Sequence, residues 1–187
     1  VNIVVSSSLE KDVHLERMAA TLPNTEYNPE QFPGLVIKFR EPKTSALIFS
    51  SGNIVCTGAR DFDQVRRSLT KIVDAVGKIG VEVEIEPEIN VQNIVASGSI
   101  GADLNLNVLA MNLDNTEYEP EQFPGLVYKL DKARATFLLF SNGKIVCTGT
   151  KDEEMVHKSV DMLMEVAILR SCHFVMTFLT KFLVIMN

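Results

Sequence analysis

The sequence predicts an α+β protein of two similar repeats, each with about five strands and two helices, and two observations lead to this prediction. First, "NTEYNPEQFPGLVIKF" at 24–39 returns 91 residues later as "NTEYEPEQFPGLVYKL" at 115–130, with 13 of 16 residues identical. Second, short apolar strands and helical stretches follow in the same order in both copies. A period of 91 is too long for a solenoid, so the pattern favours a duplicated domain with a pseudo-two-fold axis.

Strands are predicted from short apolar runs bounded by turn residues. In the first copy they cover 2–8, 34–40, 44–51, 53–59 and, from the strict alternation of "VEVEIE", 81–86. The Ser-Gly-Asn sequence at 51–53 predicts a hairpin, and the short links favour antiparallel pairing. The second copy leads into its first strand with "EINV", so the register predicts that the first strand begins ahead of Val1.

Helices are predicted from apolar residues at helical spacing over 15–22 and 65–76, and the first of these stripes is matched 91 residues later in the second copy. Asp61 and Gln64 have the spacing of a capping box at the start of the longer helix. The repeats should therefore occupy 1–91 and 92–170, and 171–187 should be an atypical hydrophobic tail.

Composition places the chain in a reducing intracellular compartment, because it has three cysteines, no Asn-x-Ser/Thr sequon and no signal peptide. Cys56 and Cys147 occupy matching apolar runs, which favours buried small side chains over a disulfide or redox pair. The apolar stretch at 167–186 is interrupted by Arg170, His173 and Lys181, so a packed or frayed tail is expected in preference to a membrane segment or a non-native chain end.

Both faces of the predicted strands are apolar, although each repeat has helices enough to cover only one. The uncovered face would expose Val4, Leu47, Phe49 and Val55, with Val95, Leu138, Phe140 and Val146 in the second copy. An apolar patch of this size marks a binding surface, a dimer interface or an internal sandwich of sheets.

Charge distribution favours nucleic acid among these alternatives, although the net charge is −6 and each half carries three more acidic than basic residues. Basic residues cluster on the strands and their ends, whereas the acids lie in the helices, the Pro-Glu loops and "VEVEIEPE". A face that is apolar at its centre and basic at its margins suits a DNA minor groove.

The paired "EQFPG", "IVCTG" and "NIV" motifs resemble those of the TATA-box-binding protein family over residues 1 to about 170, in its archaeal form. The resemblance implies a saddle, a curved ten-stranded antiparallel sheet with helices on its convex face and DNA on its concave face. It also implies a general transcription factor that binds the TATA box in the minor groove and bends it, a bend known for the family and not deduced from these residues. Association with the chromosome would follow, in the cytoplasm of an archaeon or the nucleus of a eukaryote.

The residues fit that function because A·T pairs present only acceptors in the minor groove, whereas G·C pairs add an amino group. Asn2 and Asn93 would supply amide donors, joined by the hydroxyls of Thr57 and Thr148, and the valines would supply a close apolar surface. By resemblance, Phe32 with Phe49 and Phe123 with Phe140 are the wedges that open a base step at each end. Lys38, Lys129 and Lys144 complete the DNA-binding set, the first two standing where many relatives have Arg.

The resemblance also names partners: double-stranded DNA, transcription factor B through Glu119 and Glu121, and RNA polymerase indirectly. A homodimer through the apolar face is a further expectation for the protein without DNA. The sequence contains no catalytic set, no metal-ligand spacing and no P-loop, so neither an enzyme nor a cofactor is expected. The alternative function is a duplicated structural module that uses the apolar face for protein contact.

Overall fold

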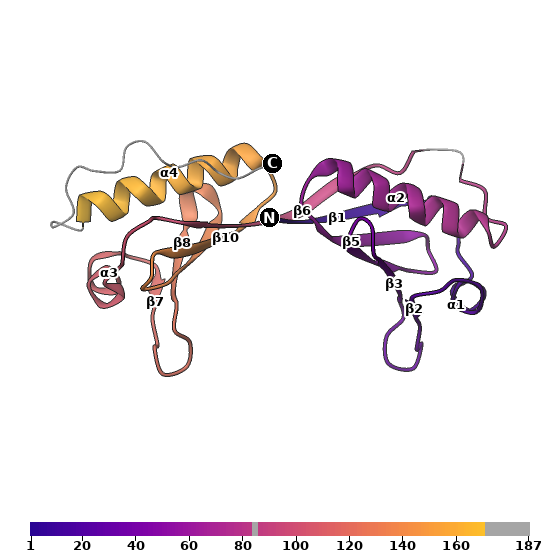
Figure 1. Ribbon diagram of the computed structural model, residues 1–187, viewed down its shortest axis with the longest axis horizontal. Coiled ribbons are helices and arrows are strands. Elements are labelled where there is room, and N and C mark those ends of the chain that lie inside the picture. Colours follow the sequence, from indigo (N-terminus) through magenta and orange to yellow (C-terminus); the bar gives the residue numbers. More distant parts are fainter. Residues whose placement is uncertain (84–85, 171–187) are drawn as a thin grey trace. The chain divides into compact units, whose positions relative to one another are not determined.

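The computed structural model describes residues 1–83 and 86–170, which form two compact units of the same architecture (Figure 1). Residues Asn2–Asn93 belong to the first unit, and residues from Ile94 onward, with Val1, belong to the second. The first unit contains β1 Asn2–Ser8, α1 Leu15–Thr21, β2 Thr25–Glu26, β3 Leu35–Phe39, β4 Thr44–Ile48, β5 Asn53–Ala59 and α2 Phe62–Gly77.

The second half repeats this order. Its elements are β6 Asn90–Ser99, α3 Leu106–Asn112, β7 Thr116–Glu117, β8 Leu126–Leu130, a 3-10 turn Asp131–Ala133, β9 Ala135–Leu139, β10 Lys144–Thr150 and α4 Glu153–Arg170. Strands are ordered β2-β3-β4-β5-β1 in the first half and β6-β10-β9-β8-β7 in the second, and the pairs within each half are antiparallel. The α+β class, the duplication and the antiparallel pairing are therefore confirmed.

One face of the strands in each half is covered by a long helix, α2 over β1 and β5 and α4 over β10. Alternate strand residues point into that layer and are fully buried, as are the helix residues that meet them. The core of the first half includes Ile3, Leu35, Ile48, Ile54 and Ile72, and that of the second includes Ile94, Leu126, Phe137, Ile145 and Leu163. Cys56 and Cys147 lie in these layers as buried free thiols, as the apolar runs predict.

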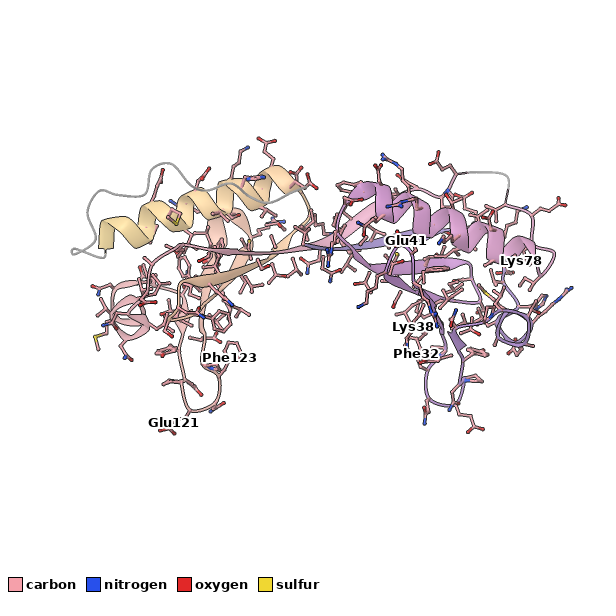
Figure 2. The ribbon with its side chains drawn as sticks, viewed as in Figure 1. Phe32, Lys38, Glu41, Lys78, Glu121 and Phe123 are labelled. Atoms are coloured by element: carbon pink, nitrogen blue, oxygen red, sulfur yellow. The ribbon has the colours of Figure 1, made fainter. Side chains whose placement is uncertain are left out.

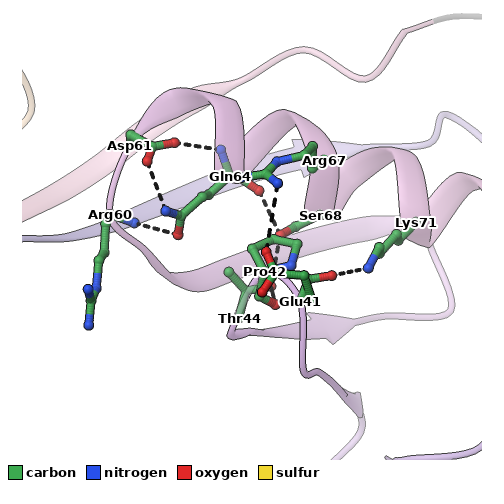
Figure 3. A network of polar contacts seen from close by, with 9 residues as sticks. All are labelled: Glu41, Pro42, Thr44, Arg60, Asp61, Gln64, Arg67, Ser68 and Lys71. Carbon is green, nitrogen blue, oxygen red and sulfur yellow. Dashed lines mark hydrogen bonds and ion pairs between the residues drawn. The ribbon is translucent and has the colours of Figure 1, made fainter. Parts of the chain in front are cut away.

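The start of α2 shows why the chain turns into a helix at this position (Figure 3). Asp61 Oδ1 accepts a hydrogen bond from the Gln64 backbone N at 2.7 Å, and Asp61 Oδ2 accepts from Gln64 Nε2 at 2.8 Å. Gln64 Oε1 in turn accepts from the Arg60 backbone N at 3.2 Å. The predicted pairing of Asp61 with Gln64 is thus confirmed, and the Asp61 carboxylate satisfies a backbone donor that the first helical turn leaves unpaired. The Gln64 side chain, however, accepts from the N–H of Arg60, one residue before the N-cap, where a capping box would accept from the N–H of Asp61 itself.

The predicted strand at 81–86 is wrong for the residues that the structure describes, because 81–83 and 86 belong to no strand. The segment leaves α2 through Gly80, and Val81 N donates to Val76 O at 3.1 Å, which ties its beginning to the helix end. Alternation makes a strand only where a neighbouring strand offers hydrogen bonds. The fifth strand is instead β2, two residues paired with Ile37 and Val36 at the outer side of β3.

The hydrophobic tail predicted at 171–187 lies outside the described residues. Within 1–83 and 86–170, no helix is long and apolar enough to cross a membrane.

Candidate nucleic-acid interface

The strand face opposite the long helix carries apolar side chains that remain partly exposed in both halves. In the first half Val4, Leu47 and Val55 alternate with fully buried neighbours and are themselves half-buried. Val95, Leu138 and Val146 are likewise half-buried in the second half, and Leu138 and Val146 lie between fully buried neighbours. We call this the open face; it carries the apolar residues that the sequence places there.

Cross-strand pairing arranges part of the open face as an apolar row. Leu47 lies opposite Val36 on β3 and opposite Val55 on β5, and Val55 lies opposite Ser6 on β1. In the second half, Leu138 lies between Val127 and Val146, and Val146 lies opposite Ser97. Val36 and Val127 were missed in the sequence, although each lies two residues from a predicted lysine and therefore on the same face.

A second row, polar this time, runs parallel to the first. Ser45 lies opposite Lys38 and Thr57, and Thr136 lies opposite Lys129 and Thr148. The open face therefore combines an apolar row, a hydroxyl row and a lysine in each half.

Asn2 joins the hydroxyl row through its side-chain oxygen. Asn2 Oδ1 accepts hydrogen bonds from Gly58 N at 2.8 Å and from Thr57 Oγ1 at 3.3 Å. The amide is thereby oriented with its oxygen toward β5, and the proton of the Thr57 hydroxyl is used inside the protein. Asn93 is half-buried at the corresponding place on β6.

Each half contains one pair of phenylalanine rings beside the open face. Phe32 and Phe49 meet edge to face with ring centroids 5.9 Å apart, and Phe123 and Phe140 meet in the same way at 6.0 Å. Phe32 is 42% exposed and Phe123 is 41% exposed, although they are large apolar side chains. The structure thus brings together the two residues of each predicted wedge.

Two lysines of the open face, Lys38 and Lys129, are held in matching ion pairs, and a third, Lys144, lies at a hairpin. Lys38 Nζ contacts Glu26 Oε1 at 2.6 Å, and Lys129 Nζ contacts Glu117 Oε1 at the same distance. The hydrogen bond from Lys129 to Glu117 and the attraction of its charge raise the pKa of the lysine. Lys144 begins β10, and its carbonyl accepts from Phe140 N at 3.0 Å, so this exposed cation lies at the hairpin that holds a wedge ring.

The loops before β3 and β8 share one backbone conformation. Asn28 O accepts from Gln31 N and Phe32 N, and Glu119 O accepts from Gln122 N and Phe123 N at nearly the same distances. Figure 2 shows Glu121 at the tip of its loop and Phe123 closer to the strands. Glu119 and Glu121 are exposed, so their carboxylates are available on the same loop that carries Phe123.

The described part of the chain holds no group of side chains suited to a metal ion, and its two buried cysteines are not activated thiols. Within 1–83 and 86–170 no three His, Cys, Asp or Glu side chains are grouped closely enough to hold a metal ion. Burial raises the pKa of Cys147 to about 11 and raises that of Cys56 as well, so both thiols stay protonated at neutral pH.

A family model described as transcription factor TFIID, or TATA-binding protein, matches residues 1–79 and 88–169. The chain belongs to the TATA-binding protein family. The resemblance drawn from "EQFPG", "IVCTG" and "NIV" is therefore confirmed, and this family consists of DNA-binding transcription factors and not of enzymes.

Relatives of known name include archaeal TATA-box-binding proteins. That of Methanothermobacter thermautotrophicus is 52% identical over 153 residues, which cover 82% of this chain and 84% of the relative. That of Archaeoglobus fulgidus is 47% identical over 166 residues, which cover 88% and 91%. The solved structure of the Methanococcus jannaschii TATA-binding protein is 42% identical, covers 90% of this chain and 97% of its own, and gives a TM-score of 0.85. These similarities confirm the predicted fold class.

Proposed function

We propose that this family member is a general transcription factor that binds the TATA box through the open face, in the minor groove. The observation that carries the proposal is the apolar row of the open face, half-exposed in both halves and flanked by hydroxyls, an asparagine and a lysine. Each repeat would cover one half of the site, and the protein would work on the chromosome, in the cytoplasm of an archaeal cell.

The chemistry of the open face matches A·T pairs. Their minor-groove edge offers acceptors only, and the amino group of guanine protrudes at G·C pairs. Val55, Leu47 and Val36 give that amino group neither room nor a hydrogen-bond partner, because the row consists of aliphatic side chains. Asn2 and Asn93 would donate to the acceptors near the centre of the site.

The ring pairs would act as wedges at the two ends. Inserting an apolar ring between base steps costs a few kcal/mol per step, and the bent duplex recovers this cost by contacting more of the protein. Phe32 and Phe123 are suited to this role because each residue is about two fifths exposed before DNA arrives.

The experiment compares a TATA-like duplex with a G·C-rich duplex of equal length at several salt concentrations, measuring affinity and bend angle. Phe123→Ala with Phe140→Ala should weaken TATA binding and reduce the bend while leaving the melting temperature nearly unchanged, since Phe123 is exposed and Phe140 is half-buried. A large drop in melting temperature with an unchanged bend would show that the rings belong to the core. Equal affinity of the unmodified protein for both duplexes would refute TATA recognition itself.

The same proposal includes recruitment of transcription factor B, and through it RNA polymerase, by Glu119 and Glu121. Support comes from the difference between loops of one conformation, since Glu119 in the second stands where the first has Asn28. An acidic loop edge of this kind would pair with a basic surface of factor B. Glu119→Arg with Glu121→Arg should therefore abolish the supershift of the DNA complex by factor B and preserve DNA binding, because positive charges would then meet across the interface. Asn28→Arg with Glu30→Arg is the matched control; equal loss from both loops would overturn the assignment.

A second candidate is a dimerisation module, favoured by the same half-exposed apolar row when no DNA is present. Sedimentation of the protein alone and with a TATA duplex distinguishes the two. If a dimer dissociates when DNA binds, the open face serves both for dimerisation and for DNA binding. If the dimer persists and does not bind DNA, the structural module is favoured.

A further inference from the structure

We infer that Gly34 and Gly125 are positioning residues that seat the two ring pairs, an inference that rests on the proposed function of the rings as wedges. Each glycine follows its wedge residue by two positions, in the sequence Phe-Pro-Gly, and comes directly before β3 or β8. Neither was among the residues that the sequence singled out as functional.

The rings occupy the space that a side chain would take. A Cβ atom on Gly34 would lie 2.6 Å from Phe32 Cε1 and 3.1 Å from Phe49 Cε1. On Gly125 it would lie 2.7 Å from Phe123 Cε1 and 3.0 Å from Phe140 Cε1. In both halves, therefore, both rings of a pair rest against the backbone of one glycine.

The requirement is for space and not for backbone conformation. Glycines with positive φ in the described residues include Gly52 and Gly143 at the hairpin turns, but neither Gly34 nor Gly125 is among them. An alanine can adopt their backbone conformation, so the cost of the substitution falls on the rings. Because the atoms in the way are the far ends of phenylalanine side chains, the rings can turn aside while the strands stay in place.

The direction of the missing Cβ ties the glycine to the open face. Leu35 and Ile37 are buried toward the helix layer, so Gly34 shares the opposite face with Val36 and Lys38. The same alternation holds for Gly125, Val127 and Lys129. The space above each glycine that the two rings occupy, which we call the seat, therefore belongs to the open face proposed to bind DNA. A small side chain in the seat would displace the wedge rings at that end of the site.

The test uses Gly125→Ala and Gly34→Ala in the full chain with a TATA duplex. A ring held away from its preferred rotamer should weaken binding roughly three- to tenfold, reduce the bend measured by energy transfer between the duplex ends, and leave the melting temperature nearly unchanged. A 2-aminopurine base at each terminal step should show less unstacking at one end for Gly125→Ala and at the other end for Gly34→Ala.

Gly77→Ala is the matched control, because a Cβ on Gly77 in α2 would have no atom within 4 Å. It should leave binding and bending unchanged. In a background of Phe123→Leu, which removes the atom nearest to the added Cβ, Gly125→Ala should lose most of its effect on binding.

A readout without DNA separates this inference from the proposed function. With 4-fluorophenylalanine at position 123, the fluorine resonance should shift in Gly125→Ala and not in Gly77→Ala. An unshifted resonance would overturn the role of Gly125 in placing the rings. If the unmodified protein bends TATA DNA, an equal bend with Gly125→Ala would overturn it as well. A shifted resonance in a protein that never prefers TATA DNA would uphold the seat and refute the function.

Discussion

Lys38 and Lys129 meet DNA, in the proposed complex, as members of ion pairs. Glu26 and Glu117 hold their ammonium groups at 2.6 Å, with both partners of each pair more than half exposed. An exposed pair of this kind contributes little to stability. The ion pair should have a larger effect on DNA binding, because a DNA phosphate must compete with the carboxylate for the lysine. A carboxylate displaced by the phosphate would then bind a cation from solution, which lowers the net number of cations released on binding.

Glu26→Gln with Glu117→Gln should therefore tighten binding to any duplex and steepen its salt dependence, by roughly 0.9 in the slope for each lysine released. Asp63→Asn with Glu154→Gln releases Arg66 and Lys158 from comparable pairs on α2 and α4 and changes the net charge equally. Titration of binding against salt compares the two. Identical slopes in both double variants would mean that overall charge, and not these lysines, controls binding.

Cys147 gives a residue-level prediction about pH. Its pKa is about 11 in the folded protein against an ordinary value of 9, so the folded chain keeps a proton that the unfolded chain loses above pH 9. The stabilisation from the neutral buried thiol is complete below pH 9 and is lost between pH 9 and 11, on the order of 2 to 3 kcal/mol.

Urea unfolding from pH 8 to 11 measures this loss. Cys147→Ala should be less stable at pH 8, because it leaves a small cavity, but its stability should fall less steeply above pH 9. A parallel fall in both proteins would assign the pH dependence to other groups.

At the scale of elements, the start of α2 depends on one side chain. Asp61 accepts two hydrogen bonds from Gln64. The same helix is tied to the start of β4 by a hydrogen bond between the Ser68 and Thr44 hydroxyls at 2.8 Å, and to the β3–β4 turn by the ion pair of Arg67 with Glu41 (Figure 3). Asp61→Ala should cost about 1 kcal/mol of unfolding free energy, the usual value of an N-cap. Asp63→Ala, an exposed neighbour in the same first turn, should cost clearly less in the same denaturant titration. Equal losses would show that helix-dipole charge, and not the cap, stabilises this end.

Elements also mark where sequence reasoning succeeds and fails. The strands of the hairpins and the apolar faces of the helices could be predicted, because they depend on hydrophobic periodicity and turn residues that lie close together in the sequence. "VEVEIE" alternates well but has no strand partner over its described residues, whereas Thr25 and Glu26 carry no apolar pattern and form β2 because β3 offers them an edge. Pairing is a long-range property, and it also explains why Val36 and Val127 emerged only from the cross-strand register.

For the molecule as a whole, duplication gives two surfaces that differ at few positions. Lys144 begins β10 where Asn53 begins β5, and Phe140 and Phe49 form the same backbone hydrogen bond to these residues. The two repeats thus match in their apolar rows, ring pairs and Lys–Glu pairs. They differ at Lys144, which would face a DNA phosphate in the proposed complex, because the first repeat has the uncharged Asn53 at that position.

Asn53→Lys should strengthen binding to TATA and G·C-rich duplexes alike and steepen the salt slope by roughly 0.9, and Lys144→Asn should do the reverse. Affinity measured against salt for both variants checks this symmetry. If either substitution altered the preference for A·T pairs, the position would contact bases, contrary to the expectation of a phosphate contact.

Asn2 has a consequence for selectivity that concerns the direction of its amide. A carboxamide can both give and receive hydrogen bonds, so alone it would tolerate the amino group of guanine as readily as the acceptors of an A·T pair. Here its receiving atom is already occupied by Gly58 N and Thr57 Oγ1, which leaves only the NH2 group to face a ligand. The main-chain N–H of Gly58 on the neighbouring strand β5 thereby makes the Asn2 amide act toward a ligand as a hydrogen-bond donor only, and this orientation is set before any DNA is bound.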